Sequence, residues 1–189
     1  MIAALAPGLL IAAPSMTDPR FQGAVVLLAE ASSDGALGFV INRTTPFTFA
    51  DLADDIGFDI AEDVRTTRVH YGGPVSPERG WILFRDPEAA EEPRDNVLRV
   101  TSELHLAATL EVLGDFVTAR NTAPFKLLLG YAGWAPQQLE GELREGAWIP
   151  LELEPDLLFA VDIDEIYESA LERLGLKPGG FVMGSGGTA

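Results

Sequence analysis

Short apolar runs separated by turn-forming residues dominate the chain, and this pattern is typical of β-strands. Two of these runs are joined only by the turn Ser32-Ser-Asp-Gly35, which predicts a β-hairpin. Both arms of this hairpin are apolar at nearly every position, so we expect other elements to cover both of its faces. The runs predict strands at 9–13, 24–29, 37–42, 69–71, 81–84, 96–100, 126–130 and 148–153.

Apolar residues at helical spacing predict two helices in the first two thirds of the chain. The first spans 49–57, with Thr48 as its N-cap and Gly57 as its C-cap. The second spans 103–117 and follows Ser102 as a cap; its few acidic residues occupy about a third of the helical wheel. A polar face that narrow indicates a helix that is largely buried.

Two further helices are predicted near the C-terminus. One spans 136–145, with a proline in its first turn. The other spans 164–174, is capped by Asp162 or Asp164, and ends at Gly175.

The order of these elements favours an α+β fold, because helices and strands do not alternate strictly. At 189 residues the chain is long enough for one well-cored domain. We therefore expect a single compact domain over 1–178, with a mixed β-sheet, packed helices and one helix largely buried. Residues 72–80 read as a turn region, 86–95 as an exposed loop, and the glycine-rich 179–189 as a flexible tail.

Acidic residues far outnumber basic ones, 29 to 13, for a net charge of −16. Residues 135–175 hold 11 acidic and 2 basic residues, which gives −9 of that total. Such a field repels polyanions, so we expect neither direct nucleic-acid binding nor attachment to an anionic membrane. Two interpretations of the acidic segment stay open: a solvated surface, or a patch that recruits a basic protein partner. The sequence leaves the oligomeric state undetermined.

Cysteine is absent, which excludes disulfides, thiolate nucleophiles and cysteine-ligated metals. Residues 1–14 are apolar, but they lack a positive n-region and are interrupted by Pro7-Gly8. No run reaches the ~18 apolar residues of a membrane span. The sequence therefore predicts a cytoplasmic protein.

Few residues form a pattern that would support catalysis. His70 and His105 have no sequence-local partner that would suggest a metal site. Asp51 and Asp55, with Asp54 beside them, could ligate a cation, but they equally suit the solvated face of a helix. Glycine-rich nucleotide-binding motifs and a Gly-x-Ser-x-Gly elbow are absent. We therefore expect no cofactor and no metal, and the missing motifs favour a non-enzymatic protein over an enzyme.

Three segments contain the ingredients of a small ligand-binding cleft. An arginine at a strand end, in Asn42-Arg43, can hold an anionic group, and glycines can bring backbone N–H groups against a ligand. Aromatic rings at a strand-to-helix corner can stack on a planar group. The candidate residues are Asn42, Arg43, Gly72, Gly73, Tyr131 and Trp134. A structural interpretation stands beside this one, in which the glycines permit sharp corners and the aromatic rings fill the core.

Several motifs in this order resemble the bacterial YqgE/AlgH family. The resemblance runs from about Pro7 to Leu158 and is weakest in 86–95 and after Leu158. It implies a single α+β domain with a mixed sheet around a helix, in a bacterial cytoplasmic protein, one relative being described as a transcriptional regulator. The motifs are Leu10-Ile-Ala-Ala-Pro-Ser-Met-Thr-Asp-Pro-Arg-Phe21, Val40-Ile-Asn-Arg43, Tyr71-Gly-Gly-Pro-Val75, Arg79-Gly80, Leu129-Gly-Tyr-Ala-Gly-Trp134, Gln138-Leu-Glu140 and Trp148.

The leading functional hypothesis is therefore a non-enzymatic regulatory or protein-interaction protein with an acidic binding surface. The alternative is a protein or enzyme that binds a small anion or nucleotide-like ligand in a cleft near Arg43 and Trp134. A DNA-binding regulator is a third hypothesis, prompted only by the family resemblance.

Overall fold

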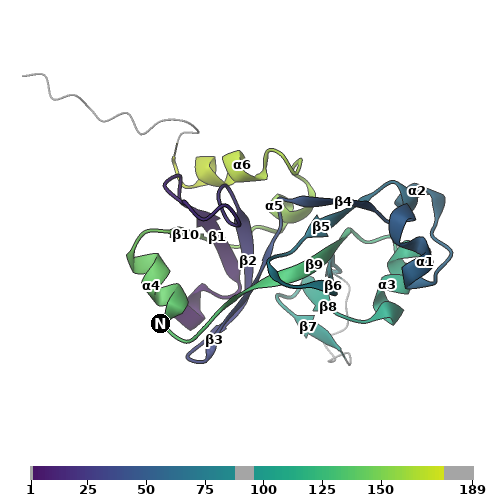
Figure 1. The fold of residues 1–189 in the computed structure, drawn as a ribbon, viewed down its shortest axis with the longest axis horizontal. Helices are drawn as coiled ribbons and strands as arrows, with labels where there is room; N and C mark the ends of the chain where they lie inside the picture. Colours follow the sequence, from purple (N-terminus) through teal and green to yellow (C-terminus); the bar gives the residue numbers. More distant parts are fainter. Residues whose placement is uncertain (1, 88–95, 177–189) are drawn as a thin grey trace, which may run out of the picture.

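A computed structural model describes residues 2–87 and 96–176 of the protein (Figure 1). The strands are β1 (Gly8–Ala12), β2 (Val25–Ser32), β3 (Gly35–Val40), β4 (Thr44–Thr48), β5 (Arg68–Tyr71), β6 (Val75–Arg85), β7 (Val97–Arg99), β8 (Leu104–Ala107), β9 (Phe125–Trp134) and β10 (Trp148–Leu151). The helices are η1 (Ile2–Leu5), η2 (Ala50–Leu52), α1 (Ala53–Ile56), α2 (Glu62–Arg65), α3 (Leu110–Val117), α4 (Gln138–Arg144), α5 (Pro155–Phe159) and α6 (Ile166–Arg173).

The ten strands form one mixed sheet, in the order β10-β1-β2-β3-β9-β6-β8-β7, with β5 beside β9 and β4 beside β5. All pairs are antiparallel except β5 with β9, which is parallel. The long strand β9 connects the two halves of the sheet, because its first half pairs with β5 and its last three residues pair with β3. The α+β fold and the mixed sheet predicted from the sequence are confirmed.

Glycines form the junction between the two halves of the sheet. Gly72 donates its N–H to Leu129 O and accepts from Val40 N, so it links β5, β9 and β3. A Cβ on Gly73 would lie 2.1 Å from the backbone carbon of Tyr131, and Gly130 has a φ of +72°. Only glycine fits where two backbones approach this closely. The junction lets one sheet curl into two halves that face each other.

Three apolar clusters follow from this curl. The central cluster lies between the two halves of the sheet and is covered by α5 and α6. A second cluster lies under α1, α2 and α3, and a third lies under α4. Figure 1 shows α4 at one end of the molecule and α1, α2 and α3 together at the other. The helices thus cover the outer faces that the strands leave apolar.

The predicted hairpin is confirmed as β2 and β3, which pair from Ser32↔Gly35 to Val26↔Val40. Its residues are buried on both faces in the half away from the turn, over 25–29 of β2 and 38–40 of β3, as their two-sided apolar pattern predicts. The other predicted strands are present as well, with shifted bounds. The sequence missed β4, α2 and α5, which are short and have weak periodicity.

The predicted helix 103–117 is wrong over its first half. Residues Leu104–Ala107 form strand β8, and the helix α3 begins only after Thr109, whose hydroxyl accepts from Val112 N. Strand β8 is buried on both faces and three of its four residues are apolar, so it lacks the alternation of a half-exposed strand and imitates a buried helix. His105 therefore lies in a strand and stacks on Phe84 at 5.3 Å. The remaining helix buries half of its eight residues.

Smaller corrections concern caps and turns. The Thr48 hydroxyl donates to Asp51 and caps no N–H group, so the predicted N-cap is wrong, whereas Gly57 does form the left-handed C-cap. Glu165, with no side-chain cap bond, occupies the N-cap position of α6 predicted for Asp162 or Asp164. The predicted turn 72–80 is shorter, because β6 begins at Val75.

Most of the predicted loop 86–95 and the whole predicted tail 179–189 lie outside the described residues. Among the helices of the described part, none is long and apolar enough to cross a membrane.

Candidate functional site

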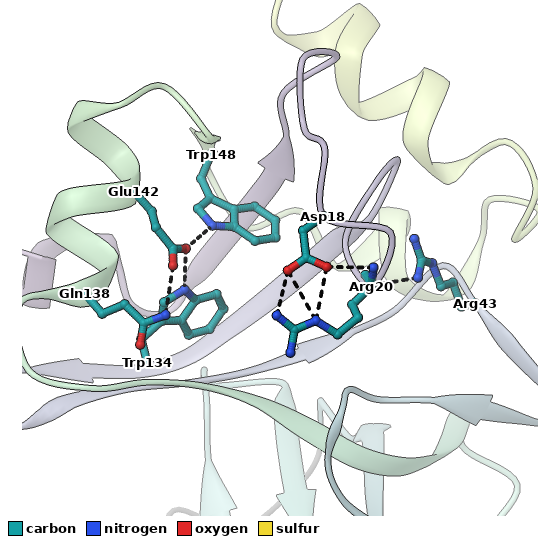
Figure 2. Close-up of polar contacts among 7 residues, drawn as sticks. All are labelled: Asp18, Arg20, Arg43, Trp134, Gln138, Glu142 and Trp148. Atoms are coloured by element: carbon teal, nitrogen blue, oxygen red, sulfur yellow. Dashed lines mark hydrogen bonds and ion pairs between the residues drawn. The ribbon is translucent and has the colours of Figure 1, made fainter.

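Two indole rings share one carboxylate at the end of the molecule covered by α4. Trp134 ends β9 and Trp148 begins β10, and their indole N–H groups donate to the same Oε2 of Glu142 at 2.9 and 2.7 Å (Figure 2). The other carboxylate oxygen accepts from Gln138, one turn earlier on α4, at 2.8 Å. The rings meet edge to face, with centroids 5.9 Å apart. Glu142 therefore fixes both indoles, which are only 6% and 3% exposed.

An ion pair in the loop before β2 faces these indoles. Arg20 donates from Nη2 to Asp18 Oδ2 at 2.7 Å, and its Nε lies 3.1 and 3.2 Å from the two carboxylate oxygens. The hydrogen bonds from the Arg20 side chain, and then from its backbone N–H, lower the pKa of Asp18. Phe21, the next residue, contacts Trp148 edge to face at 5.4 Å. Figure 2 shows the ion pair beside the two indoles.

Together these groups line a cleft of about 280 Å³, which we call the indole cleft. Its walls are largely aromatic and aliphatic, and its charged and amide side chains are Asp18, Arg20, Gln138 and Glu142. This combination of apolar walls and a few placed polar groups is typical of a binding site. The cleft is lined by Met16, Thr17, Asp18, Arg20, Phe21, Pro74, Val75, Gly133, Trp134, Gln138, Glu142, Ala147 and Trp148.

A wider and more open hollow of about 630 Å³ also contacts Trp134 and lies beside the β2–β3 hairpin. Alanines and backbone form most of its lining, and its only charged residues are Glu30 and Asp34. It has no cluster of converging polar side chains. We therefore take the smaller indole cleft as the candidate site.

The structure brings only one of the six candidate residues, Trp134, into the lining of the indole cleft. Asn42 accepts from Val25 N at 2.8 Å and donates to Gly23 O at 2.9 Å, so it holds the start of β2. The Arg43 guanidinium donates to Arg20 O at 2.7 Å and to Gln22 O at 2.6 Å. Both side chains thereby support the loop that carries Asp18 and Arg20.

Gly72, Gly73 and Tyr131 lie at the junction of the two sheet halves. The two glycines allow the backbones to cross, and Pro74 and Val75 directly after them line the cleft. The Tyr131 ring packs on Trp81 at 6.3 Å and belongs to the central cluster. The glycine motif thus shapes the wall of the cleft through its backbone.

Sequence reasoning missed Asp18, Arg20, Glu142 and Trp148 as site residues. Asp18-Pro-Arg20 carries a readable signal, since an acid and a base two residues apart in a turn can pair locally. Glu142 lies one helical turn after Gln138, and that spacing places both on one face of α4. Nothing in the sequence indicates that Trp148 reaches the same carboxylate.

His70 on β5 and Lys126 on the neighbouring strand β9 form a second pair of titratable groups, of which His70 is buried and Lys126 is half-buried. Lys126 Nζ lies 3.1 Å from His70 Nε2. Burial and, secondarily, the Lys126 charge lower the pKa of His70 to about 3. Burial lowers the pKa of Lys126 to about 8. Among the described residues, no three His, Asp or Glu side chains are placed to hold a metal ion.

Residues 9–179 match a protein-family model described as AlgH-like. A UPF0301 protein from Anaeromyxobacter sp. (strain K) is 47% identical over 190 residues, which cover 98% of this chain and 95% of that protein. A UPF0301 protein from Paracoccus denitrificans is 38% identical over 171 residues, 90% of each chain.

Solved structures show the same fold. The solution structure of the AlgH protein from Pseudomonas aeruginosa matches with a TM-score of 0.78 at 29% identity, over 98% of this chain and 96% of that one. The crystal structure of a protein from Corynebacterium diphtheriae matches with a TM-score of 0.70 at 23% identity, over 89% and 86% of the two chains.

Proposed function

Since the chain belongs to the AlgH-like family, whose fold it shares with the AlgH protein from Pseudomonas aeruginosa, we propose that it is a non-catalytic interaction protein. In this proposal it recruits a basic segment of a partner protein through the indole cleft and the acidic surface beside it. We assign it a regulatory role in the cytoplasm as part of the same proposal.

The observation that carries the proposal is the position of the acidic excess. The segment 135–175, with its net charge of −9, contains α4, which forms one wall of the cleft, and also α5 and α6. Eight of its eleven acidic residues are exposed: Glu145, Glu152, Asp156, Asp162, Asp164, Glu165, Glu168 and Glu172. Only two arginines offset them. A basic segment is therefore attracted toward the apolar cleft by a field of one sign.

The cleft itself is arranged for binding. Glu142 already accepts three N–H donors, which fixes its carboxylate in place. The exposed Asp18–Arg20 pair at the mouth can exchange partners with an incoming charged group. Rigid aromatic walls with a polar rim are the usual anatomy of a protein-binding hot spot.

The test is a titration of the protein with labelled basic, neutral and acidic peptides of equal length, followed by fluorescence anisotropy. We expect binding of the basic peptide at about 20 mM salt that weakens at about 300 mM, where exposed charges are screened. If the basic peptide binds no more tightly than the acidic peptide at low salt, the acidic surface serves only for solvation.

A charge-reversal pair locates the binding surface. Glu145→Lys with Glu172→Lys places two cations at helix C-termini, where the helix dipole favours them, so the fold should persist. The control, Asp54→Lys with Asp55→Lys, makes the same charge change on α1 at the opposite end of the molecule. We expect the first variant to lose more affinity than the second. Equal losses would mean that net charge alone, and not this surface, attracts the peptide.

The cleft also supports a small-ligand function as a second candidate, because it is enclosed and carries an exposed guanidinium. A thermal-shift screen of nucleotides, phosphorylated metabolites and organic acids tests it. A ligand at about 100 times its Kd should stabilise the protein by about 2.7 kcal/mol. In this case Arg43→Ala should weaken the shift, because Arg43 holds the loop that carries Arg20. An unchanged shift in that variant would show that ligand binding does not depend on the contacts of Arg43 with this loop.

A further inference from the structure

In the Asp18–Arg20 pair, the Asp18 carboxylate binds the Arg20 side chain in the way that it could bind an arginine from another protein. Arg20 approaches the carboxylate with two nitrogens, Nε and Nη2, in the forked arrangement that guanidinium groups make with carboxylates. Its side chain is nevertheless 62% exposed, whereas that of Asp18 is 32% exposed. The carboxylate is thus the more enclosed partner, and the arginine reaches it from the solvent side.

The loop does not depend on the Arg20 side chain for its shape. The backbone N–H groups of Phe21 and Gln22 both donate to Asp18 O, and the Arg20 N–H donates to Asp18 Oδ1. From outside the loop, Arg43 donates to the carbonyls of Arg20 and Gln22. Removing the guanidinium therefore leaves this set of hydrogen bonds intact and exposes the Asp18 carboxylate.

A guanidinium suits the surroundings of this carboxylate. The Arg20 guanidinium carbon lies 5.9 Å from the centre of the Phe21 ring, within the range of a cation–π contact. Glu142 adds a second negative charge to the lining of the same cleft. A lysine ammonium could pair with the negative charge, but it cannot make the forked hydrogen bonds of a guanidinium or stack on the Phe21 ring.

We infer that the indole cleft binds an arginine side chain of the basic partner segment, and that Arg20 occupies the Asp18 carboxylate until that arginine displaces it. This inference rests on the proposed recruitment of a basic segment and names the group recognised. Arg20 is then a built-in competitor: it keeps Asp18 paired in the free protein and lowers the affinity for the partner.

Two substitutions should change the affinity in opposite directions. Arg20→Gln removes the competitor and should tighten binding of a labelled arginine-containing peptide by up to about fivefold, the range expected for competition with an exposed ion pair. Asp18→Asn keeps an oxygen for the Arg20 N–H but removes the charge, and it should weaken binding by about tenfold or more. An otherwise identical lysine peptide should bind more weakly than the arginine peptide to the unsubstituted protein.

Matched controls separate this effect from net charge. Arg120→Gln removes the positive charge of another exposed ion pair, Arg120–Asp115, directly after α3 at the far end of the molecule, as Arg20→Gln does in the loop. Asp63→Asn removes one exposed negative charge from α2. Neither should alter peptide affinity by more than about twofold, since a distant exposed charge is largely screened. Circular dichroism verifies the fold of each variant.

The outcomes test separately the displacement of Arg20 by an arginine and the recruitment of a basic segment. If Arg20→Gln and Arg120→Gln raise the affinity equally, Arg20 is no competitor and the inference is overturned, while recruitment of a basic segment stands. If the unsubstituted protein shows no preference for basic peptides, the proposed function fails. If Asp18→Asn does not fold, the comparison of the two arginine variants still decides.

Discussion

Trp134 connects stability and binding within one side chain. It is 6% exposed, lies in the cluster under α4, and donates its N–H to Glu142. Trp134 lines the cleft, but little of its surface is accessible there. Its burial therefore makes it first a core residue, whatever the cleft binds.

Trp134→Ala should cost on the order of 3–5 kcal/mol of unfolding free energy, because it removes a buried aromatic ring and leaves a cavity. Trp134→Phe keeps most of the apolar volume but loses the hydrogen bond to Glu142, so it should cost less. Urea denaturation of both variants measures the difference. A Trp134→Ala protein that melts within about two degrees of the parent would contradict a core role.

The buried His70 and the half-buried Lys126 beside it predict a pH dependence of stability. The folded protein lowers the pKa of His70 from 6.5 to about 3, so between these values the unfolded chain binds more protons than the folded one. Stability must then fall as the pH drops below 6.5. His70 should account for about 2 kcal/mol of the loss between pH 7 and pH 5.

His70→Asn isolates this contribution, because carboxyl groups titrate equally in both proteins and cancel in the comparison. We expect urea denaturation to show a smaller loss from pH 7 to pH 5 in the variant. Lys126 predicts a second rise in stability between pH 8 and pH 10.5, where only the unfolded chain keeps the lysine charged. A variant with the same acid sensitivity as the parent would show that His70 is accessible to protons in the folded state.

At the scale of elements, the crossing of β9 with the start of β6 sets the curl of the sheet. Gly73→Ala should be strongly destabilising, since its Cβ would meet the backbone of Tyr131 at 2.1 Å in a conformation with φ of +154°. Neither backbone can move without breaking the junction. The expected loss is about 3 kcal/mol or more, beyond the usual range for single substitutions.

Gly141 provides a control of opposite sign. It lies inside α4, and a Cβ there meets nothing within 4 Å. Gly141→Ala should therefore stabilise the protein by roughly 0.5–1 kcal/mol through helix propensity. Thermal denaturation of the two alanine variants should move the melting temperature in opposite directions. Similar shifts in both would show that the close approach at Gly73 does not constrain the fold.

Local pattern predicts the elements that satisfy local rules and fails where tertiary contacts decide. The β2–β3 hairpin was predictable because its turn and its apolar run agree. Strand β8 was not predictable, because a strand buried on both faces lacks the alternation of apolar and polar residues that distinguishes a strand from a helix. The site divides in the same way: the aromatic corner indicated Trp134, but only the packing of α4 against β10 brings Glu142 to Trp148.

At the scale of the whole molecule, charge decides which partners can approach. The protein has a net charge of −16, and more than half of this charge lies in one segment, 135–175. Among the described residues, several arginines are paired with carboxylates, as Arg85 is with Glu103 and Asp156, and Arg173 with Glu154. The net negative field repels the phosphates of nucleic acid, whereas it attracts a basic protein segment.

We therefore expect no binding to mixed-sequence or promoter DNA tighter than about 10⁻⁴ M at physiological salt, the weak end of ordinary non-specific affinity. Binding that depends on phosphate neutralisation also strengthens steeply at low salt, so the titration by fluorescence anisotropy should be repeated there. The basic peptide serves as the positive control, since the same reduction in salt should strengthen its binding while leaving DNA unbound. Micromolar affinity for DNA with a steep salt slope would show that the arginines of this acidic protein form a phosphate-binding surface after all, and would favour the DNA-binding hypothesis over recruitment of a basic protein.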